Sequence, residues 1–219
     1  NVIEGFVLAA QNASEAGFDG VEIHGANGYL LEQFLNPHVN NREDEYGGSM
    51  ENRSRFTIEV VNAVADAIGK EKVGIRFSPF SKLGDLADYG EEETHNTYAY
   101  LSKELDELQI AYVHVAVNAP IPAKTFEAIR DNFSGTIILA NGLTPETGEQ
   151  ALHKGFADLV AFGRSFLSNP DFIERILTNA ALNPVDYSSL YTPGSRGYTD
   201  YPAFNSSKQL KIYQNEIYQ

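Results

Sequence analysis

The chain has 219 residues and a formal net charge of −14, and it contains no cysteine. Hydrophobic residues make up 42% and charged residues 21%, the balance of a globular protein with a core of useful size. The acidic charge and the scattered Lys and Arg argue against nucleic-acid binding. No apolar stretch is long enough for a membrane span, and no signal peptide is evident. Because cysteine is absent, disulfides and thiolate metal sites are excluded. We expect a cytoplasmic protein without a metal centre.

Helical spacing of apolar residues alternates with short apolar runs along most of the chain. Five strands between helices predict an α/β fold with a parallel sheet and helices packed outside it. No G-x-G-x-x-G follows a strand, so the main signal of a doubly wound dinucleotide fold is missing, although five strands also fall short of a full eight-stranded (β/α)8 barrel. The expected helices are Val2–Ala16, Arg53–Ile68, Glu91–Leu108, Ala123–Asn132, Glu146–Lys154 and Pro170–Ala180, and the expected strands are Phe18–His24, Val73–Phe77, Ala111–Val117, Thr136–Ala140 and Leu159–Phe162.

Two segments fall outside this alternation. Residues 37–52 form a long polar loop, which we expect to be functional or ordered by its neighbours. The chain from Pro184 onward is rich in Tyr, Ser, Gly and Pro and is predicted to be irregular, with at most one short helix. We therefore expect a barrel portion at residues 1–183 and an irregular tail at 184–219.

A first group of polar residues follows the first strand. His24 ends that strand, where barrels carry catalytic groups, and Asn27 follows near a helix start. Both side chains can donate hydrogen bonds toward one point, and such donors stabilise the enolate that forms when a hydride reaches the β-carbon. The phenol of Tyr29 can supply the proton that completes a reduction. The competing interpretation is a structural histidine, a plain turn at Asn27-Gly28 and a core tyrosine.

A second signal is Arg76, which lies inside an otherwise apolar strand. A buried guanidinium needs a partner, because an uncompensated buried charge is costly. The partner is either an electron-rich cofactor atom, such as the N1/O2 edge of a reduced flavin, or a carboxylate such as Glu22 or Asp19.

A third signal comes from two successive strand ends. Asn141-Gly142 follows one strand and Gly163-Arg164 follows the next. In barrels the loops after the last two strands commonly build a phosphate site from backbone N–H groups, and the guanidinium of an arginine can add two parallel N–H donors for phosphate oxygens. The alternative is that these glycines mark ordinary turns.

Several motifs, in order along nearly the whole chain, closely resemble the old yellow enzymes. They are HGANGYLL (24–31), QFLNP (33–37), NREDEYGGS (41–49), ENRSRF (51–56), GIRFSP (74–79), ADLVAFGRSFLSNP (157–170) and GYTDYP (197–202). The resemblance implies an FMN-dependent ene-reductase on a TIM barrel, in which NAD(P)H reduces the flavin and the flavin reduces the C=C bond of an activated alkene.

The resemblance also assigns roles to individual residues. His24 and Asn27 would bind the carbonyl or nitro oxygens of the substrate, and Tyr29 would be the proton donor. Arg76 would contact the flavin N1/O2 edge. The FMN phosphate site would include Asn141, Gly142, Gly163 and Arg164, and Tyr198 would approach the substrate from the tail.

The sequence departs from the family's pattern in its first strands and in two loops. The family's first strands, with their contacts to the flavin ring, are absent, so we expect the C-terminal portion of the barrel, with four or five of its strands. Asn141 stands where glycine is common, and the segment 118–122 is compact. We expect activity only with a complementary N-terminal half, on a separate chain or in a permuted one, or with a second copy. The rival hypotheses are an inactive half-barrel that binds no flavin, and a phosphate-binding barrel lyase or isomerase.

Overall fold

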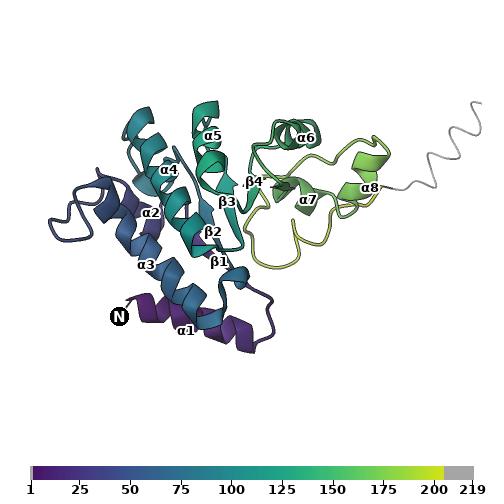
Figure 1. Cartoon of the computed structure of the whole chain (residues 1–219). Coiled ribbons are helices and arrows are strands. Elements are labelled where there is room, and N and C mark those ends of the chain that lie inside the picture. Colours follow the sequence, from purple (N-terminus) through teal and green to yellow (C-terminus); the bar gives the residue numbers. More distant parts are fainter. Residues whose placement is uncertain (1, 205–219) are drawn as a thin grey trace, which may run out of the picture. The chain divides into compact units, whose positions relative to one another are not determined.

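The computed structural model describes residues 2–204 and divides into two compact units (Figure 1). The first unit is Asn1–Ala161 and holds a parallel sheet with its helices. The second is Phe162–Gln219 and holds two short helices in its described part. The predicted boundary between residues 183 and 184 stays a prediction.

The five strands form one sheet in sequential order, and every neighbouring pair is parallel. A doubly wound sheet would reverse its strand order at a switch point, whereas the order seen here is that of consecutive units of a (β/α)8 barrel. The predicted α/β barrel portion is therefore confirmed, and all five expected runs are strands of it. The strands are β1 (Val21–Gly25), β2 (Val73–Phe77), β3 (Tyr112–Ala116), β4 (Thr136–Ala140) and β5 (Leu159–Ala161).

Helices connect the strands of the first unit, as the crossovers of a parallel sheet require. Side-chain caps fix the start of two of them: Ser49 Oγ accepts from the backbone of Asn52, and Thr144 forms a reciprocal capping box with Thr147. The helices are α1 (Val2–Glu15), α2 (Leu30–Leu35), α3 (Met50–Ile68), α4 (Glu91–Leu108), α5 (Ala123–Asn132) and α6 (Pro145–His153), with 3-10 turns at Lys70–Lys72 and Leu83–Asp85; the second unit has α7 (Arg164–Ser168) and α8 (Phe172–Leu177).

The two faces of the sheet differ sharply in chemistry, because successive strand residues point to opposite sides. One face is the core beneath the helices: Ile23, Ile75, Val113 and Ile137 are paired in register across four strands, and each is at most 4% exposed. The other face carries a polar row in which His24, Arg76 and His114 are register neighbours. A polar row on the inner face of a barrel is where a site would lie.

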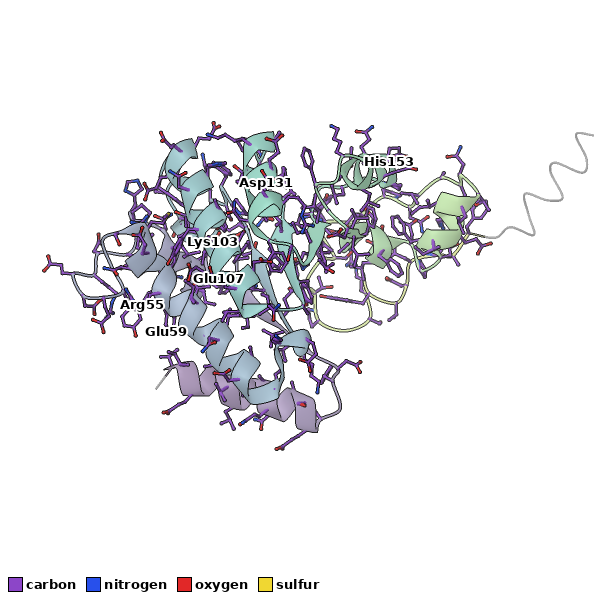
Figure 2. The ribbon with its side chains drawn as sticks, viewed as in Figure 1. Arg55, Glu59, Lys103, Glu107, Asp131 and His153 are labelled. Atoms are coloured by element: carbon purple, nitrogen blue, oxygen red, sulfur yellow. The ribbon has the colours of Figure 1, made fainter. Side chains whose placement is uncertain are left out.

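The outer helices keep their charged side chains away from this core. Figure 2 shows Arg55 and Glu59 on α3 and Lys103 and Glu107 on α4, and all but the half-buried Glu59 are exposed. Among the described residues, no helix combines the length and the apolar character that crossing a membrane would require.

Some elements differ from their expected bounds, and two short helices were not expected. The first strand begins at Val21 and not at Phe18, whose side chain is 68% exposed after the turn at Gly17. The helix expected at Pro170–Ala180 is present but shorter, because α8 spans only Phe172–Leu177. The helix α7, which precedes it and is separated from it by Asn169 in extended backbone, was not predicted. The short helix α2 was not predicted at all. The tail is irregular from residue 178 to 204, and the rest of the predicted tail lies outside the described residues.

The long polar loop is ordered by its neighbours, which was one of the two expectations for it. Asn40 Nδ2 donates to the carbonyls of Phe34 at 2.7 Å and Tyr46 at 2.6 Å. The buried Arg53 donates to the carbonyls of Leu35 and Gly48 on either side of the loop.

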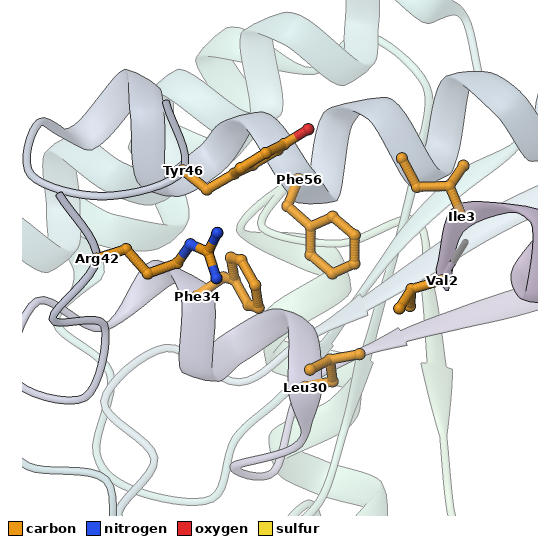
Figure 3. A pocket seen from close by; sticks show the side chains of 7 residues that line it. All are labelled: Val2, Ile3, Leu30, Phe34, Arg42, Tyr46 and Phe56. Atoms are coloured by element: carbon orange, nitrogen blue, oxygen red, sulfur yellow. The ribbon is translucent and has the colours of Figure 1, made fainter. Parts of the chain in front are cut away.

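Arg42 closes the same loop over aromatic rings. Its guanidinium stands 5.8 Å from the ring centre of Phe34 and 5.7 Å from that of Tyr46. The three side chains line one side of a shallow pocket, whose other walls are Val2, Ile3, Leu30 and Phe56 (Figure 3). None of the predicted site residues lines this pocket.

Candidate active site

The three residues predicted after the first strand come together at the carboxyl end of β1. The rings of His24 and Tyr29 are 5.0 Å apart at their centres, and both side chains are exposed. Asn27 lies between them in sequence with a positive φ of 59°, and its backbone N–H donates to Ser78 Oγ at 2.7 Å. The loop thus presents an imidazole, an amide and a phenol on the open side of the sheet edge.

Gly28 makes this loop geometry possible. Its φ is 78°, in the left-handed region, and a Cβ at this position would stand 2.1 Å from the carbonyl oxygen of Leu83. A side chain would therefore clash with backbone. The turn at Asn27-Gly28 packs tightly against another loop, which a plain surface turn would not need.

A buried carboxylate holds the loop from beneath, and the sequence did not single it out. Glu32 is 4% exposed and accepts from Gly28 N–H and Ser78 Oγ, both at 2.6 Å, and from Tyr98 Oη at 3.2 Å. Burial raises the pKa of Glu32 above its ordinary value, and the three hydrogen bonds offset only part of that rise. The available signal was one acidic residue inside the apolar run LLEQFL.

Arg76 stands beside His24, with which it is paired in the β1–β2 register. Its Nε is buried and has no hydrogen-bond partner among the described residues, where no carboxylate pairs with it either. The alternative partners, Glu22 and Asp19, are therefore not used: Glu22 instead binds Nδ1 of His114 at 2.8 Å. A buried Nε without a partner on the inner face can donate to an acceptor from outside the chain.

The charge of Arg76 also acts on His24. Burial lowers the pKa of His24, the cation of Arg76 lowers it further, and the charge of Glu22 opposes both with a smaller effect. The lowered pKa favours the neutral imidazole at neutral pH, which has one N–H that can donate and no positive charge.

The ends of the third and fourth strands reach the same loop through side-chain amides. Asn118 Nδ2 donates to Asn27 Oδ1 at 2.5 Å, and Asn141 Nδ2 donates to Asn118 Oδ1. Asn141 and Gly142 both have positive φ, 71° and 64°, and the backbone at Gly142 is exposed. The side chain of Asn141 thus faces Asn118, while the neighbouring backbone is open to a ligand.

The other predicted phosphate residues lie in the second unit. Gly163 precedes α7 and Arg164 begins it, and both are exposed. The Arg164 guanidinium lies 5.9 Å from the ring centre of Tyr187, and the side chain of Tyr198 is 42% exposed. The roles of Gly163, Arg164 and Tyr198 stay predictions.

The chemistry of the first unit fits a flavin. The unpartnered Nε of Arg76 suits the electron-rich N1/O2 edge of the ring, and the open backbone at Gly142 suits a phosphate. In the described part of the chain, no group of three or more His, Asp or Glu side chains is arranged to hold a metal ion.

Comparison with known proteins places the chain in a family. A model described as the NADH:flavin oxidoreductase / NADH oxidase family matches residues 1–183. The putative 12-oxophytodienoate reductase 11 of Oryza sativa subsp. japonica is 47% identical over 209 residues, covering 92% of this chain and 56% of that protein. The 12-oxophytodienoate reductase 2 of Arabidopsis thaliana is 46% identical over 214 residues, covering 94% of this chain and 56% of that protein.

Similar solved structures support the same family. Morphinone reductase in complex with tetrahydroNAD is 43% identical and superposes with a TM-score of 0.88, covering 94% of this chain and 56% of that one. The chain thus spans a little over half the length of the relatives it matches. Its similarity to them extends over nearly its whole length, and it belongs to the old yellow enzyme family of NADH:flavin oxidoreductases.

Proposed function

We propose that the protein is an FMN-dependent ene-reductase that uses NAD(P)H to reduce the C=C bond of activated alkenes. The observation that carries this proposal is the unpartnered Nε of Arg76 beside a neutral His24. Asn27 and Tyr29, which follow β1, add a side-chain amide and a phenol to these two groups. A cation for an electron-rich ring edge, two neutral donors and a phenol are the groups that such a reduction requires.

When bound, FMN supplies the hydride that reaches the β-carbon of the alkene. His24 and Asn27 donate hydrogen bonds to the carbonyl or nitro oxygen of the substrate and stabilise the negative charge that develops there. Arg76 holds the flavin edge by charge and hydrogen bonding. Tyr29 gives its phenolic proton to the α-carbon, so the alkene gains one hydride and one proton.

The phosphate of FMN would be held at the later strand ends. The proposal rests on the family resemblance, on the open backbone at Asn141 and Gly142, and on the exposure of Gly163 and Arg164. Backbone N–H groups and a guanidinium are the usual ligands of a phosphate in barrels. Tyr198 would approach the substrate from the tail.

The names of the relatives indicate the substrate class. The 12-oxophytodienoate and morphinone reductases are named for ketones conjugated to a C=C bond, and the morphinone reductase structure holds a reduced nicotinamide analogue. We therefore propose enones, enals and nitroalkenes as substrates and NAD(P)H as the reductant.

Activity would also need further strands beside β1. In the described residues, β1 pairs only with β2, and residues of α1 and β1, with Val64 of α3, line a pocket. Parallel strands are normally buried on both faces and paired at both edges. We propose that a complementary N-terminal barrel half, or a second copy of the chain, completes the barrel.

The test is to follow flavin absorbance and NADPH consumption. The protein, alone and mixed with the N-terminal half of a relative, is titrated with FMN and then given NADPH and 2-cyclohexenone. We expect bound FMN and enone-dependent NADPH oxidation in the completed barrel. A completed barrel that retains no flavin absorbance after free FMN is removed would overturn the proposal in favour of an inactive assembly fragment, and isomerase or lyase turnover without FMN would do so in favour of the other rival.

A further inference from the structure

The side-chain amides of three asparagines, from three separate loops, are linked by hydrogen bonds that all run in one direction and end at the proposed substrate-binding amide of Asn27. We call these linked amides the relay. Asn141 follows β4, Asn118 follows β3, and Asn27 follows β1, so 91 residues separate Asn27 from its partner Asn118. Each donates from Nδ2 to the Oδ1 of the next, from Asn141 to Asn118 and from Asn118 to Asn27. All three side chains are partly buried.

The direction of these hydrogen bonds determines whether Asn27 presents its Nδ2 or its Oδ1 to a ligand. A side-chain amide has an acceptor oxygen at one corner and donor hydrogens at the other. Because the Oδ1 of Asn27 is occupied by Asn118, its Nδ2 is the remaining corner, and it has no hydrogen-bond partner among the described residues. The backbone of Asn27 is fixed through Ser78, so rotation of the amide by half a turn is the principal freedom left.

Rotation of the Asn27 amide by half a turn would present an acceptor to the substrate in place of a donor. With Nδ2 outward, Asn27 donates to a carbonyl or nitro oxygen and stabilises developing negative charge. With Oδ1 outward, it would face the substrate oxygen with lone pairs. Asn27 alone has no means of choosing between the two orientations.

We propose that Asn118 is a positioning residue for the substrate: with Asn141 behind it, Asn118 holds the Asn27 amide in the orientation that donates to the substrate oxygen. The inference rests on the proposed function and deepens it. It gives a role to the side chain of Asn141, which stands where the resemblance expects glycine, and to the compact segment that begins at Asn118.

Aspartate substitutions test the direction, because a carboxylate accepts hydrogen bonds and cannot donate them. In Asn141→Asp, the new carboxylate must accept from Asn118, which would turn that amide over and then turn Asn27 over as well. We expect turnover of 2-cyclohexenone to fall roughly 10-fold to 100-fold, because one donor to the substrate oxygen is lost. Asn118→Asp should produce the same loss.

A control separates the relay from a charge effect acting through space. In the background Asn118→Leu the side chain can neither donate nor accept, so any loss that Asn141→Asp still causes there, through its place beside the proposed phosphate site, does not pass through the relay. With FMN saturating, we expect that loss to be several-fold smaller than in the native background, a coupling that a double-mutant cycle measures. If Asn141→Asp slows turnover equally in both backgrounds, the relay is wrong. Asn118→Ala serves as a second relay-breaking background in case the leucine variant does not fold.

A second readout does not depend on catalysis. The side-chain NH2 of Asn27 can be followed by 1H–15N NMR, assigned by its loss in Asn27→Asp. We expect rapid exchange of these protons with solvent in the native protein and slowed exchange in Asn118→Asp, where they would bind the carboxylate. Unchanged exchange would overturn the relay even in an active enzyme. The expected slowing in a protein without alkene reductase activity would support the relay and reject the proposed function instead.

Discussion

Arg76 and His24 are paired residues in the register of β2 with β1, and the cation of one lowers the pKa of the other. The buried Nε of Arg76 has no hydrogen-bond partner among the described residues. One strand pair therefore supplies both a cation for the flavin edge and a neutral imidazole for the substrate.

Replacing Arg76 by glutamine should raise the pKa of His24. Burial still lowers that pKa, but the repulsion between the imidazolium and the guanidinium is removed, so protonation becomes easier. A histidine with a lowered pKa stays neutral to a lower pH than usual, and in the variant it should gain its proton at a higher pH. NMR titration of the His24 ring signals measures this shift. Arg55→Gln, at an exposed position on α3, is the matched control, and an equal His24 pKa in all three proteins would disprove the coupling.

Replacing Glu32 by alanine should destabilise the protein by on the order of 3 kcal/mol. The carboxylate accepts from three buried donors, and each donor left without an acceptor costs roughly 1–3 kcal/mol. The gain from removing a buried carboxylate offsets part of that sum.

Urea denaturation measures the effect of Glu32→Ala. The control is Glu127→Ala on the exposed side of α5, which should change the free energy of unfolding by no more than about 0.5 kcal/mol. Equal effects of the two substitutions would show that Glu32 does not hold the loop.

Replacing Arg164 by glutamine should weaken FMN binding and leave riboflavin binding almost unchanged. Riboflavin has the same ring without the phosphate, and a hydrogen bond to a charged group is worth roughly 1.5–3 kcal/mol, or about 10-fold to 100-fold in affinity. Fluorescence titration of the completed barrel with both ligands gives the comparison. Arg196→Gln, an exposed arginine of the same unit, is the control. Parallel losses for both ligands would assign Arg164 a structural role.

The fold could be predicted because periodicity is a local property. Four of the five strands and the helices α3, α4 and α5 matched their expected positions closely, since each has a regular apolar face and a clear end, while the first strand begins three residues later than expected. The segment 164–180 was predicted poorly because Pro170 and extended Asn169 divide two helices of five and six residues, which are too short for periodicity to distinguish.

The site could be predicted only where it lies within one loop or strand. His24, Asn27, Tyr29 and Arg76 follow from local motifs. Glu32 and Asn118 do not, because what matters in them is contact with residues distant in sequence: Ser78 and Tyr98 for Glu32, and Asn27 for Asn118. Nothing in the local pattern indicates which amides and carboxylates will meet once parallel strands bring their ends together.

Tyr29 is the proposed proton donor in an alkene reduction driven by a bound flavin. Its ring centre lies 5.0 Å from that of His24, and the side chain is exposed. A phenylalanine at this position keeps the ring and removes the proton. General acids contribute roughly 100-fold or more to such steps, and Tyr191→Phe, at a residue 90% exposed in the second unit, is a matched control.

Anaerobic stopped-flow spectroscopy of the completed barrel measures the two half-reactions separately by flavin absorbance. Tyr29→Phe should slow reoxidation by 2-cyclohexenone roughly 100-fold or more, while flavin reduction by NADPH and both rates of Tyr191→Phe match the unmodified protein. Reoxidation at the unmodified rate in Tyr29→Phe would contradict the account.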